Sequence, residues 1–189
     1  EILLFADDTC CFVSGRDPAE TSQILNRDLD RLNKWAKQWK VIFNPSKSKD
    51  IIFSEKRYLF NSPPLILDGS FVERVHEHKH LGIYLNTSLC WARQIHETCL
   101  RANRKLAVLR SVRFLKRSTL DLLYKVCVRS TIEYGLVIYW HTLKPSEAAR
   151  IKQIQYRAAK SVQGLYIFLH SPNWKGTSLG KPLTIVLSS

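Results

Sequence analysis

The sequence predicts an α+β protein: a small antiparallel sheet with one long helix, followed by a region made of helices alone. Two apolar runs, residues 2–6 and 9–13, predict a hairpin with its tip at Asp7 and Asp8. Apolar residues then recur at helical spacing over residues 18–40, and helical periodicity returns in the second half of the chain. This order of elements is typical of an antiparallel sheet with its helices segregated.

The helix expected at residues 18–40 has a defined start and one apolar face. Asp17 can cap it, Pro18 suits the first helical position, and Glu20 sits three residues after the cap. Its apolar face comprises Leu25, Leu29, Leu32, Ala36 and Trp39. Short strands are expected at residues 41–43, 50–54, 65–67, 71–75 and 80–85. Turns are expected at residues 44–49 and 68–69.

The second half of the chain predicts three helices. The apolar face of the first comprises Ile95, Cys99, Ala102, Leu106 and Leu109. The second is expected at about residues 118–137, and the third at about 146–163 with Gly164 as its stop. We therefore expect one unit at residues 1–85 and a helical unit at residues 86–164. Residues 165–189 show no clear period and are left unassigned.

The chain is strongly basic. Lys and Arg number 29 against 16 Asp and Glu, which gives a formal charge of +13. Such a charge favours a polyanionic partner, nucleic acid first and an anionic membrane surface second, although a basic surface can also serve solubility alone. One segment has no acidic residue among its cations: Arg101, Arg104, Lys105, Arg110, Arg113, Lys116 and Arg117. The first three are expected on one helical face, suited either to phosphates or to solvent.

Cysteine usage and hydropathy indicate in which cellular compartment the protein is found. The five cysteines show no CxxC spacing, so we interpret them as reduced thiols of an intracellular protein. No apolar stretch has the roughly 20 residues that a membrane-spanning helix needs. The chain starts at Glu1 and contains no Met, and we therefore expect it to be a piece of a longer product.

The adjacent carboxylates of Asp7 and Asp8 raise each other's proton affinity, and a divalent cation would relieve their repulsion. Mg²⁺ prefers carboxylate oxygens, water and substrate phosphates, which suits two-metal phosphoryl transfer. A solvated acidic turn is the alternative. His76, His78 and His80 alternate along an expected strand, which resembles a metal site, although a polar strand face explains the pattern as well.

Several motifs in order resemble one family. FADDT, WAKQW, KVIFNPSKSK and HKHLGIYL look like the carboxyl half of the palm of non-LTR (LINE-type) retrotransposon reverse transcriptases. CWARQIHETCLRANRKLAVLRSV, STIEYGLVIYW and IKQIQYRAAKSVQG are similar to the thumb region that follows in those proteins. The resemblance covers about residues 1–164, and its implied fold is a partial polymerase palm followed by an all-α thumb. Ala6 argues against retroviral-type enzymes, which usually have Met there.

The resemblance implies roles for individual residues. Asp7 and Asp8 match the catalytic pair that holds Mg²⁺, with Mn²⁺ as an alternative metal. Lys47 matches a lysine near the nucleotide triphosphate, and Lys49 is its less direct neighbour. The motif that packs against the primer end is matched by His80, Leu81 and Gly82. The basic thumb helices would grip the backbone of the primer–template duplex.

The resemblance also implies what this chain lacks. The family needs a third Asp on an earlier palm strand, and it needs fingers, all of which would precede Glu1. We therefore expect a fragment of an RNA-directed DNA polymerase that adds deoxynucleotides to a primer 3′ hydroxyl, inactive by itself. Expected partners are an RNA template, a DNA primer, deoxynucleoside triphosphates and the missing fingers and upstream palm, with no membrane. The expected location is the nucleus and cytoplasm.

Two alternatives remain open from the sequence. The first alternative to the polymerase fragment is a non-catalytic remnant that binds nucleic acid through its thumb. The second is a degenerate translation that folds poorly. The second alternative rests on the expectation that the sheet lacks its central strand and exposes a long strand edge, which is an aggregation hazard.

Overall fold

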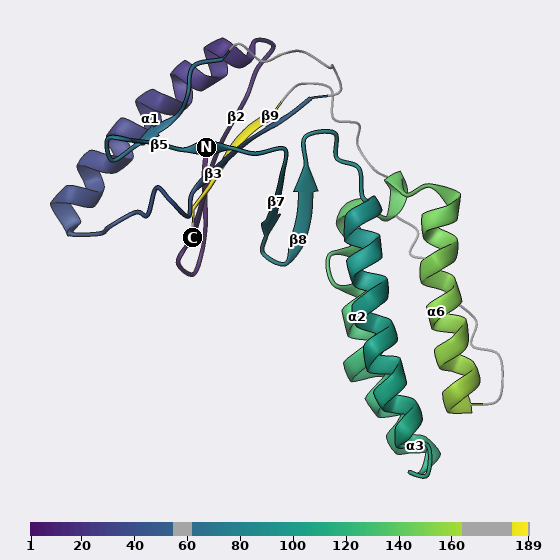
Figure 1. Cartoon of the computed structure of the whole chain (residues 1–189). Coiled ribbons are helices and arrows are strands. Elements are labelled where there is room, and N and C mark those ends of the chain that lie inside the picture. The colour runs from purple at the N-terminus through teal and green to yellow at the C-terminus, as the bar shows by residue number, and fades with distance from the viewer. Residues whose placement is uncertain (55–61, 164–182, 189) are drawn as a thin grey trace. The chain divides into compact units, whose positions relative to one another are not determined.

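The computed structural model describes residues 1–54, 62–163 and 183–188, and the chain divides into two compact units (Figure 1). The first, here called the sheet unit, comprises Glu1–Cys90 and Leu179–Ser189. The second, the helical unit, comprises Trp91–Ser178. No helix in the described ranges is long and apolar enough to cross a membrane.

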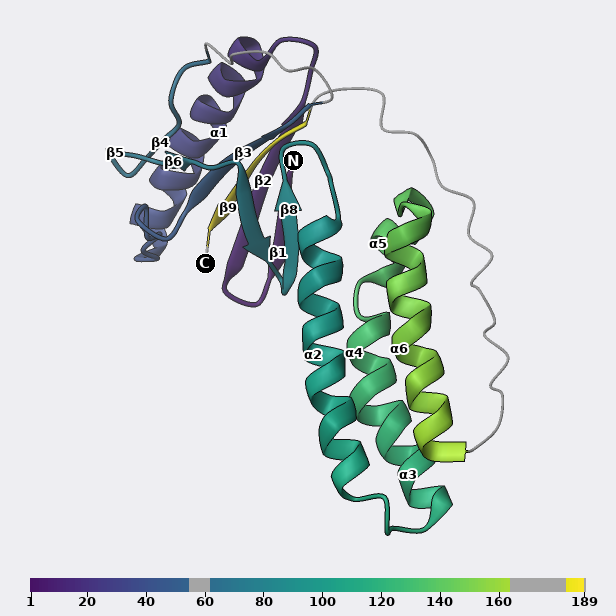
Figure 2. The same ribbon diagram turned by 45° about the vertical axis from the view of Figure 1, so that its right-hand side comes forward.

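The sheet unit is built on a five-stranded sheet with α1 against one face (Figures 1 and 2). Its strands, in spatial order, are β1 (Ile2–Phe5), β2 (Asp8–Ser14), β9 (Leu183–Ser188), β3 (Lys49–Phe53) and β6 (Glu73–Arg74). Two short hairpins accompany it, β4 (Ile66–Leu67) with β5 (Ser70–Phe71), and β7 (Glu77–His80) with β8 (Ile83–Asn86). β3 and β6 pair in parallel, and the other pairs in the sheet are antiparallel.

The centre of the sheet is occupied by β9, the last strand of the chain. Six residues of β9 pair with β2, from Ser188 opposite Thr9 to Leu183 opposite Ser14. Five of them also pair with β3, from Leu187 opposite Lys49 to Leu183 opposite Phe53. The expectation of a missing central strand was therefore wrong. A strand from the segment left unassigned fills the gap between β2 and β3.

Helix α1 (Pro18–Trp39) begins as expected. The carboxylate of Asp17 accepts a hydrogen bond from Ala19 N at 2.9 Å, and Pro18 occupies the first turn. Leu25, Leu29 and Ala36 are buried, but the side chain of Trp39, which was expected on the same face, is exposed. The strand expected at residues 41–43 does not form.

Each face of the sheet carries its own apolar cluster. On the α1 face, Cys11 packs with Leu25 and Leu29 of the helix and with Leu65, Leu67 and Val72. On the opposite face, Cys10 packs with Ile51 and Phe53, and Leu85 and Leu89 lie against them. Because neighbouring residues in a strand point to opposite faces, Cys10 and Cys11 belong to different clusters, as the sequence predicts.

Two of the expected strands are in fact divided. Residues 80–85 were expected as one strand, but they span the turn between β7 and β8. Leu81 and Gly82 form this turn with φ of 45° and 81°, and two consecutive positive φ values are typical of a two-residue hairpin turn. The expected turn at Asp68 and Gly69 forms in the same way, with φ of 47° and 75°. The segment expected as a strand at residues 71–75 is split between β5 and β6.

The helical unit begins with α2 (Ala92–Ser111), whose five expected apolar residues are all buried. The helix expected at 118–137 is instead α3 (Arg117–Leu123), a π-helical segment η1 (Tyr124–Arg129) and α4 (Ser130–Glu133). It ends there because Tyr134 leaves helical backbone angles and Gly135 has φ 68°. Three elements follow: α5 (Leu136–Tyr139), a 3₁₀ turn η2 (Trp140–Thr142) and α6 (Pro145–Gln163). The expected stop of α6 at Gly164 lies outside the described residues.

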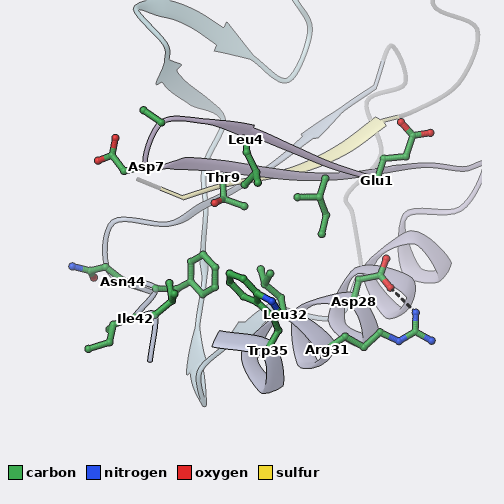
Figure 3. Close-up of a pocket in the computed structure, with 14 residues that line it drawn as sticks. Glu1, Leu4, Asp7, Thr9, Asp28, Arg31, Leu32, Trp35, Ile42 and Asn44 are labelled. Atoms are coloured by element: carbon green, nitrogen blue, oxygen red, sulfur yellow. Dashed lines mark hydrogen bonds and ion pairs between the residues drawn. The ribbon is translucent and has the colours of Figure 1, made fainter. Parts of the chain in front are cut away.

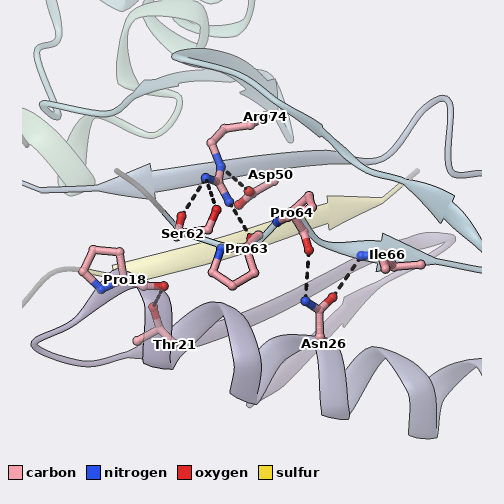
Figure 4. A network of polar contacts seen from close by, with 9 residues as sticks. All are labelled: Pro18, Thr21, Asn26, Asp50, Ser62, Pro63, Pro64, Ile66 and Arg74. Carbon is pink, nitrogen blue, oxygen red and sulfur yellow. Dashed lines mark hydrogen bonds and ion pairs between the residues drawn. The ribbon is translucent and has the colours of Figure 1, made fainter. Parts of the chain in front are cut away.

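A buried ion pair ties β6 to β3 in the sheet unit (Figure 4). Arg74 Nε donates to Asp50 Oδ2 at 2.6 Å, and only 1% of the Asp50 side chain is exposed. The same guanidinium donates to Ser62 Oγ at 2.6 Å and to the carbonyl of Pro63 at 3.3 Å. Burial raises the pKa of Asp50 above its usual value, while the hydrogen bond and charge of Arg74 act in the opposite direction.

We expect Arg74→Ala to destabilise the chain by about 3 kcal/mol, because it leaves the Asp50 carboxylate buried without its partner. Urea unfolding measures this. Glu73→Ala is the matched control, since it removes the exposed partner of the neighbouring ion pair with Lys49 and should cost less than about 1 kcal/mol.

The loss in Arg74→Ala should also depend on pH. The native-state pKa of Asp50 is raised above its unfolded value, so the stability linked to this group is greatest below the unfolded value of about 3.9. It is lost as the pH rises through the native-state pKa. The destabilisation should therefore be largest at neutral pH and shrink on acidification. Equal losses in both variants, or a loss independent of pH, would contradict this role of Arg74.

Candidate active site

The hairpin that carries the two carboxylates is displaced by one residue from the expected position. Phe5 pairs with Asp8, so the two loop residues are Ala6 and Asp7, and Asp8 is the first residue of β2. Ala6 has φ 54°, which permits the tight turn between the two strands. Asp7 is exposed at the tip and Asp8 is half-buried, so the two carboxylates have different surroundings.

Asp8 interacts with two histidines of β7. Burial lowers the pKa of His80 below its usual value, and the negative charge of Asp8 opposes this shift. Burial also lowers the pKa of His78, helped by the charges of His80 and Lys49 and again opposed by Asp8. The four side chains therefore form one electrostatic cluster, here called the Asp8 cluster. The sequence placed His78 and His80 on one strand face, but only the tertiary fold brings that face to Asp8.

Asp7 instead lines a pocket of about 1000 Å³ between the β1–β2 hairpin, α1 and the segment after it (Figure 3). Asp7 and Asn44 lie at one end, and the ion pair of Asp28 with Arg31 (3.3 Å) lies at the other. The walls between are largely apolar and include Ile2, Leu4, Leu32, Trp35, Ile42 and Phe43. The sequence alone does not predict this pocket, because it depends on where the segment after α1 folds back.

The two candidate triphosphate lysines differ in their contacts. The turn that carries them is closed by Asn44, whose Oδ1 accepts from Ser46 N at 3.1 Å and from Ser46 Oγ at 2.7 Å. Lys47 is exposed on this turn. Lys49, by contrast, forms a short ion pair with Glu73 and also donates to the carbonyl of Ser46. Of the two, Lys47 is the one presented to solvent.

The expected primer-end motif forms a hairpin tip. His80 is the last residue of β7, and Leu81 and Gly82 are the turn residues. His80 is thus adjacent to this turn and also belongs to the Asp8 cluster. The structure therefore joins two sequence motifs, FADDT and HKHLG, that are separated by about 70 residues in the chain.

The seven basic residues expected to contact nucleic acid differ in their contacts within the helical unit. Lys105 Nζ donates to Thr131 Oγ1 at 2.7 Å, and Arg110 Nε donates to Ser161 Oγ at 3.2 Å. Arg101 is half-buried, and its Nε is enclosed without a hydrogen-bond partner in the described residues. Arg101, Arg104 and Lys105 lie at helical spacing within α2, as expected, but Arg101 is less exposed than the other two. Of the seven expected cations, six are exposed: Arg104, Lys105, Arg110, Arg113, Lys116 and Arg117.

Within residues 1–54, 62–163 and 183–188, no group of three or more His, Cys, Asp or Glu side chains is arranged to hold a metal ion. His76, His78 and His80 thus do not form the metal site that their spacing resembles. Asp7 and Asp8 likewise have no third ligand there. Two carboxylates fit Mg²⁺ chemically, but as a pair they supply only part of a coordination shell.

Comparison with known proteins returns four relatives. A probable RNA-directed DNA polymerase from the Drosophila melanogaster transposon X-element is 27% identical over 171 residues, covering 88% of this chain. A second, from transposon BS of the same species, is 26% identical and covers 96%. The RNA-directed DNA polymerase of the Drosophila funebris mobile element jockey is 24% identical and covers 86%. No protein-family model and no solved structure matches the chain.

The chain is related to the reverse transcriptases of non-LTR retrotransposons. The resemblance seen in the sequence is thereby confirmed. The chain spans about a fifth of the length of these reverse transcriptase relatives, between 18% and 20%. The roles of individual residues stay predictions.

We expect Asp8→Asn to lower the pKa of His80 further, because the variant removes the negative charge that favours the imidazolium. Asp7→Asn is the matched control and should leave the His80 titration unchanged, since Asp7 lies on the pocket side of the hairpin. NMR titration of the imidazole protons measures both. Equal shifts from the two variants, or none from Asp8→Asn, would show that Asp8 and His80 are not neighbours.

Proposed function

We propose that this chain is a segment of an RNA-directed DNA polymerase, comprising part of the palm and the thumb. The observation that carries the proposal is the FADD hairpin, with Asp8 beside His80 on one side of the sheet and an exposed lysine turn after α1. The names of the relatives point to the same chemistry. The proposed reaction is the addition of deoxynucleotides to a primer 3′ hydroxyl on an RNA template, with release of pyrophosphate.

We propose that Asp7 and Asp8 are two of the ligands of the catalytic Mg²⁺ or Mn²⁺ in the complete polymerase. When bound, the metal would activate the primer hydroxyl and stabilise the leaving phosphate oxygens. The chain itself contributes the two carboxylates, one at the hairpin tip and one anchored at the start of β2. Because the described residues supply no third ligand, the remaining carboxylate must come from elsewhere in the polymerase.

The roles proposed for the remaining site residues follow from how exposed their side chains are and which contacts they already make. Lys47 is proposed to contact the triphosphate, since Lys49 is engaged by Glu73. His80, Leu81 and Gly82 are proposed to contact the primer end as a hairpin tip. In the helical unit, Arg104, Arg113 and Lys116 are proposed to contact the phosphates of the RNA–DNA duplex. The free cysteines are in keeping with work inside the cell, in the nucleus and cytoplasm.

We expect the purified chain to show no Mg²⁺- or Mn²⁺-dependent primer extension, because two carboxylates alone do not hold two metals. Extension of a labelled primer on an RNA template measures this. An Asp7→Asn, Asp8→Asn double variant sets the background. Extension well above that background by the unaltered chain would overturn the proposal that the segment is inactive by itself.

A second candidate function is nucleic-acid binding without catalysis. The incomplete ligand set and the outward cations of the helical unit favour it. We expect the chain to bind RNA–DNA duplex with an affinity that falls steeply with salt. The triple variant Arg104→Ala, Arg113→Ala, Lys116→Ala should weaken binding and reduce the slope of log K against log salt by about 0.9 for each lost phosphate contact.

The matched control for this experiment removes three exposed cations of the sheet unit, in Arg16→Ala, Arg27→Ala, Lys34→Ala. This variant has the same net charge but should retain most of the affinity. Fluorescence anisotropy with a labelled duplex at several salt concentrations distinguishes the two variants. Equal losses would show that binding is due to net charge alone, and an affinity independent of salt would contradict phosphate binding altogether.

A further inference from the structure

The position of β9 in the sheet has a second consequence. β9 runs antiparallel to both of its neighbours, so β2 and β3 run parallel to each other and are joined only through it. The place between them is a slot for one strand, with ladder partners on both sides. Six residues of β9 pair along β2 and five along β3.

The backbone contacts show which groups line this slot. Phe12 N donates to the carbonyl of Glu1, and Val75 N donates to the carbonyl of Asp50. Phe12 and Asp50 therefore direct their peptide groups away from the slot. Because peptide groups alternate along a strand, Cys11 and Ile51 direct theirs into it. An empty slot would leave two rows of backbone donors and acceptors without partners, at a cost similar to that of lost hydrogen bonds.

β9 reaches this slot from a distant part of the sequence. The sheet unit is discontinuous, because the whole helical unit separates Cys90 from the segment that contains β9. Closing so long a loop within one chain carries an entropic cost that grows with its length. The segment LTIVLS is uncharged, lacks proline and is rich in β-branched and aliphatic residues, which suits pairing with any complementary strand edge.

We propose that the slot between β2 and β3 accepts β9 from a second copy of this chain, so that two copies exchange their last strands. The backbone pairs that seat β9 are the same whichever copy supplies it, and each copy offers both the slot and the strand. Such an exchange of identical elements is a low-cost route to a dimer. It is favoured when the chain concentration exceeds the effective concentration of the tethered strand.

A disulfide across the register tests the exchange. Cys10 is opposite Leu187. The peptide groups of Cys10, like those of Phe12, point away from β9. Cys10 and Leu187 therefore form a non-hydrogen-bonded pair, with Cα atoms about 4.5 Å apart. This is within the range that a disulfide spans. The thiol introduced by Leu187→Cys can therefore link to Cys10 only where β9 occupies the slot.

Two variants are refolded together at several concentrations and oxidised. The donor carries Leu187→Cys and Cys10→Ala, and the acceptor is the unaltered chain with a mass tag. Exchange predicts a disulfide-linked heterodimer whose fraction rises with concentration. Its digest should contain the acceptor peptide of Cys10 joined to the donor peptide that carries the Leu187→Cys substitution. Thr184→Cys is the control in the donor, because it is opposite Val13 and Ile52, neither of which is a thiol.

The possible outcomes are distinct. If Leu187→Cys in an otherwise unaltered chain links only within one chain at every concentration, exchange is overturned. A dimer that forms without the disulfide between Cys10 and the introduced thiol indicates another surface, such as the exposed edge strand β1, and also overturns the proposal. Should Leu187→Cys prevent folding, Val186→Cys with Cys11 tests the same slot through the adjacent pair. Absence of both links would show that β9 does not occupy the slot.

Discussion

The sheet unit depends on the pairing of β9 with β2 and β3 at the same time. β2 begins with Asp8, and β3 carries Asp50 and continues the lysine turn, yet these two strands have no direct pairing. β9 is the element that fixes the distance between them. Everything that lies on the two sides of the slot, the carboxylate hairpin on one and the Arg74 ion pair on the other, takes its position from this central strand.

The two faces of the sheet have different chemistry as a result. One face is closed by α1 over an apolar cluster that includes Cys11. The other carries a smaller cluster with Cys10 and, further along β2, the Asp8 cluster with His78 and His80. The adjacent carboxylates of the hairpin thus lie in different surroundings, Asp7 beside an apolar pocket and Asp8 beside two histidines.

The sequence predicted those elements whose signals are local. Asp17, Pro18 and a 3.6-residue period define α1, whose bounds were predicted to within one residue. A five-residue apolar face defines α2, and all five residues are buried as predicted. Features that depend on distant contacts could not be predicted. LTIVLS has no alternating pattern, and its partners lie more than a hundred residues earlier. Leu81 resembles a strand residue and nothing local shows its positive φ, which is why β7 and β8 were merged. The same difference between local and distant signals applies to the site residues. Asp7 and Asp8 were recognised from the motif, whereas the approach of His78 to Asp8 depends on the tertiary fold.

Amide hydrogen exchange at β3 measures directly whether β9 occupies the centre of the sheet. Asp50 directs its carbonyl to Val75, and Ser54 N donates to the carbonyl of Thr87, so the intervening amides of Ile51 and Phe53 face β9 and no other strand. Both amides should exchange slowly in the intact chain and rapidly in a chain that ends before Leu183, while helix α2 keeps its protection. Rapid exchange of Ile51 and Phe53 in the intact chain would contradict the placement of β9, and with it the explanation of how the carboxylate hairpin is held.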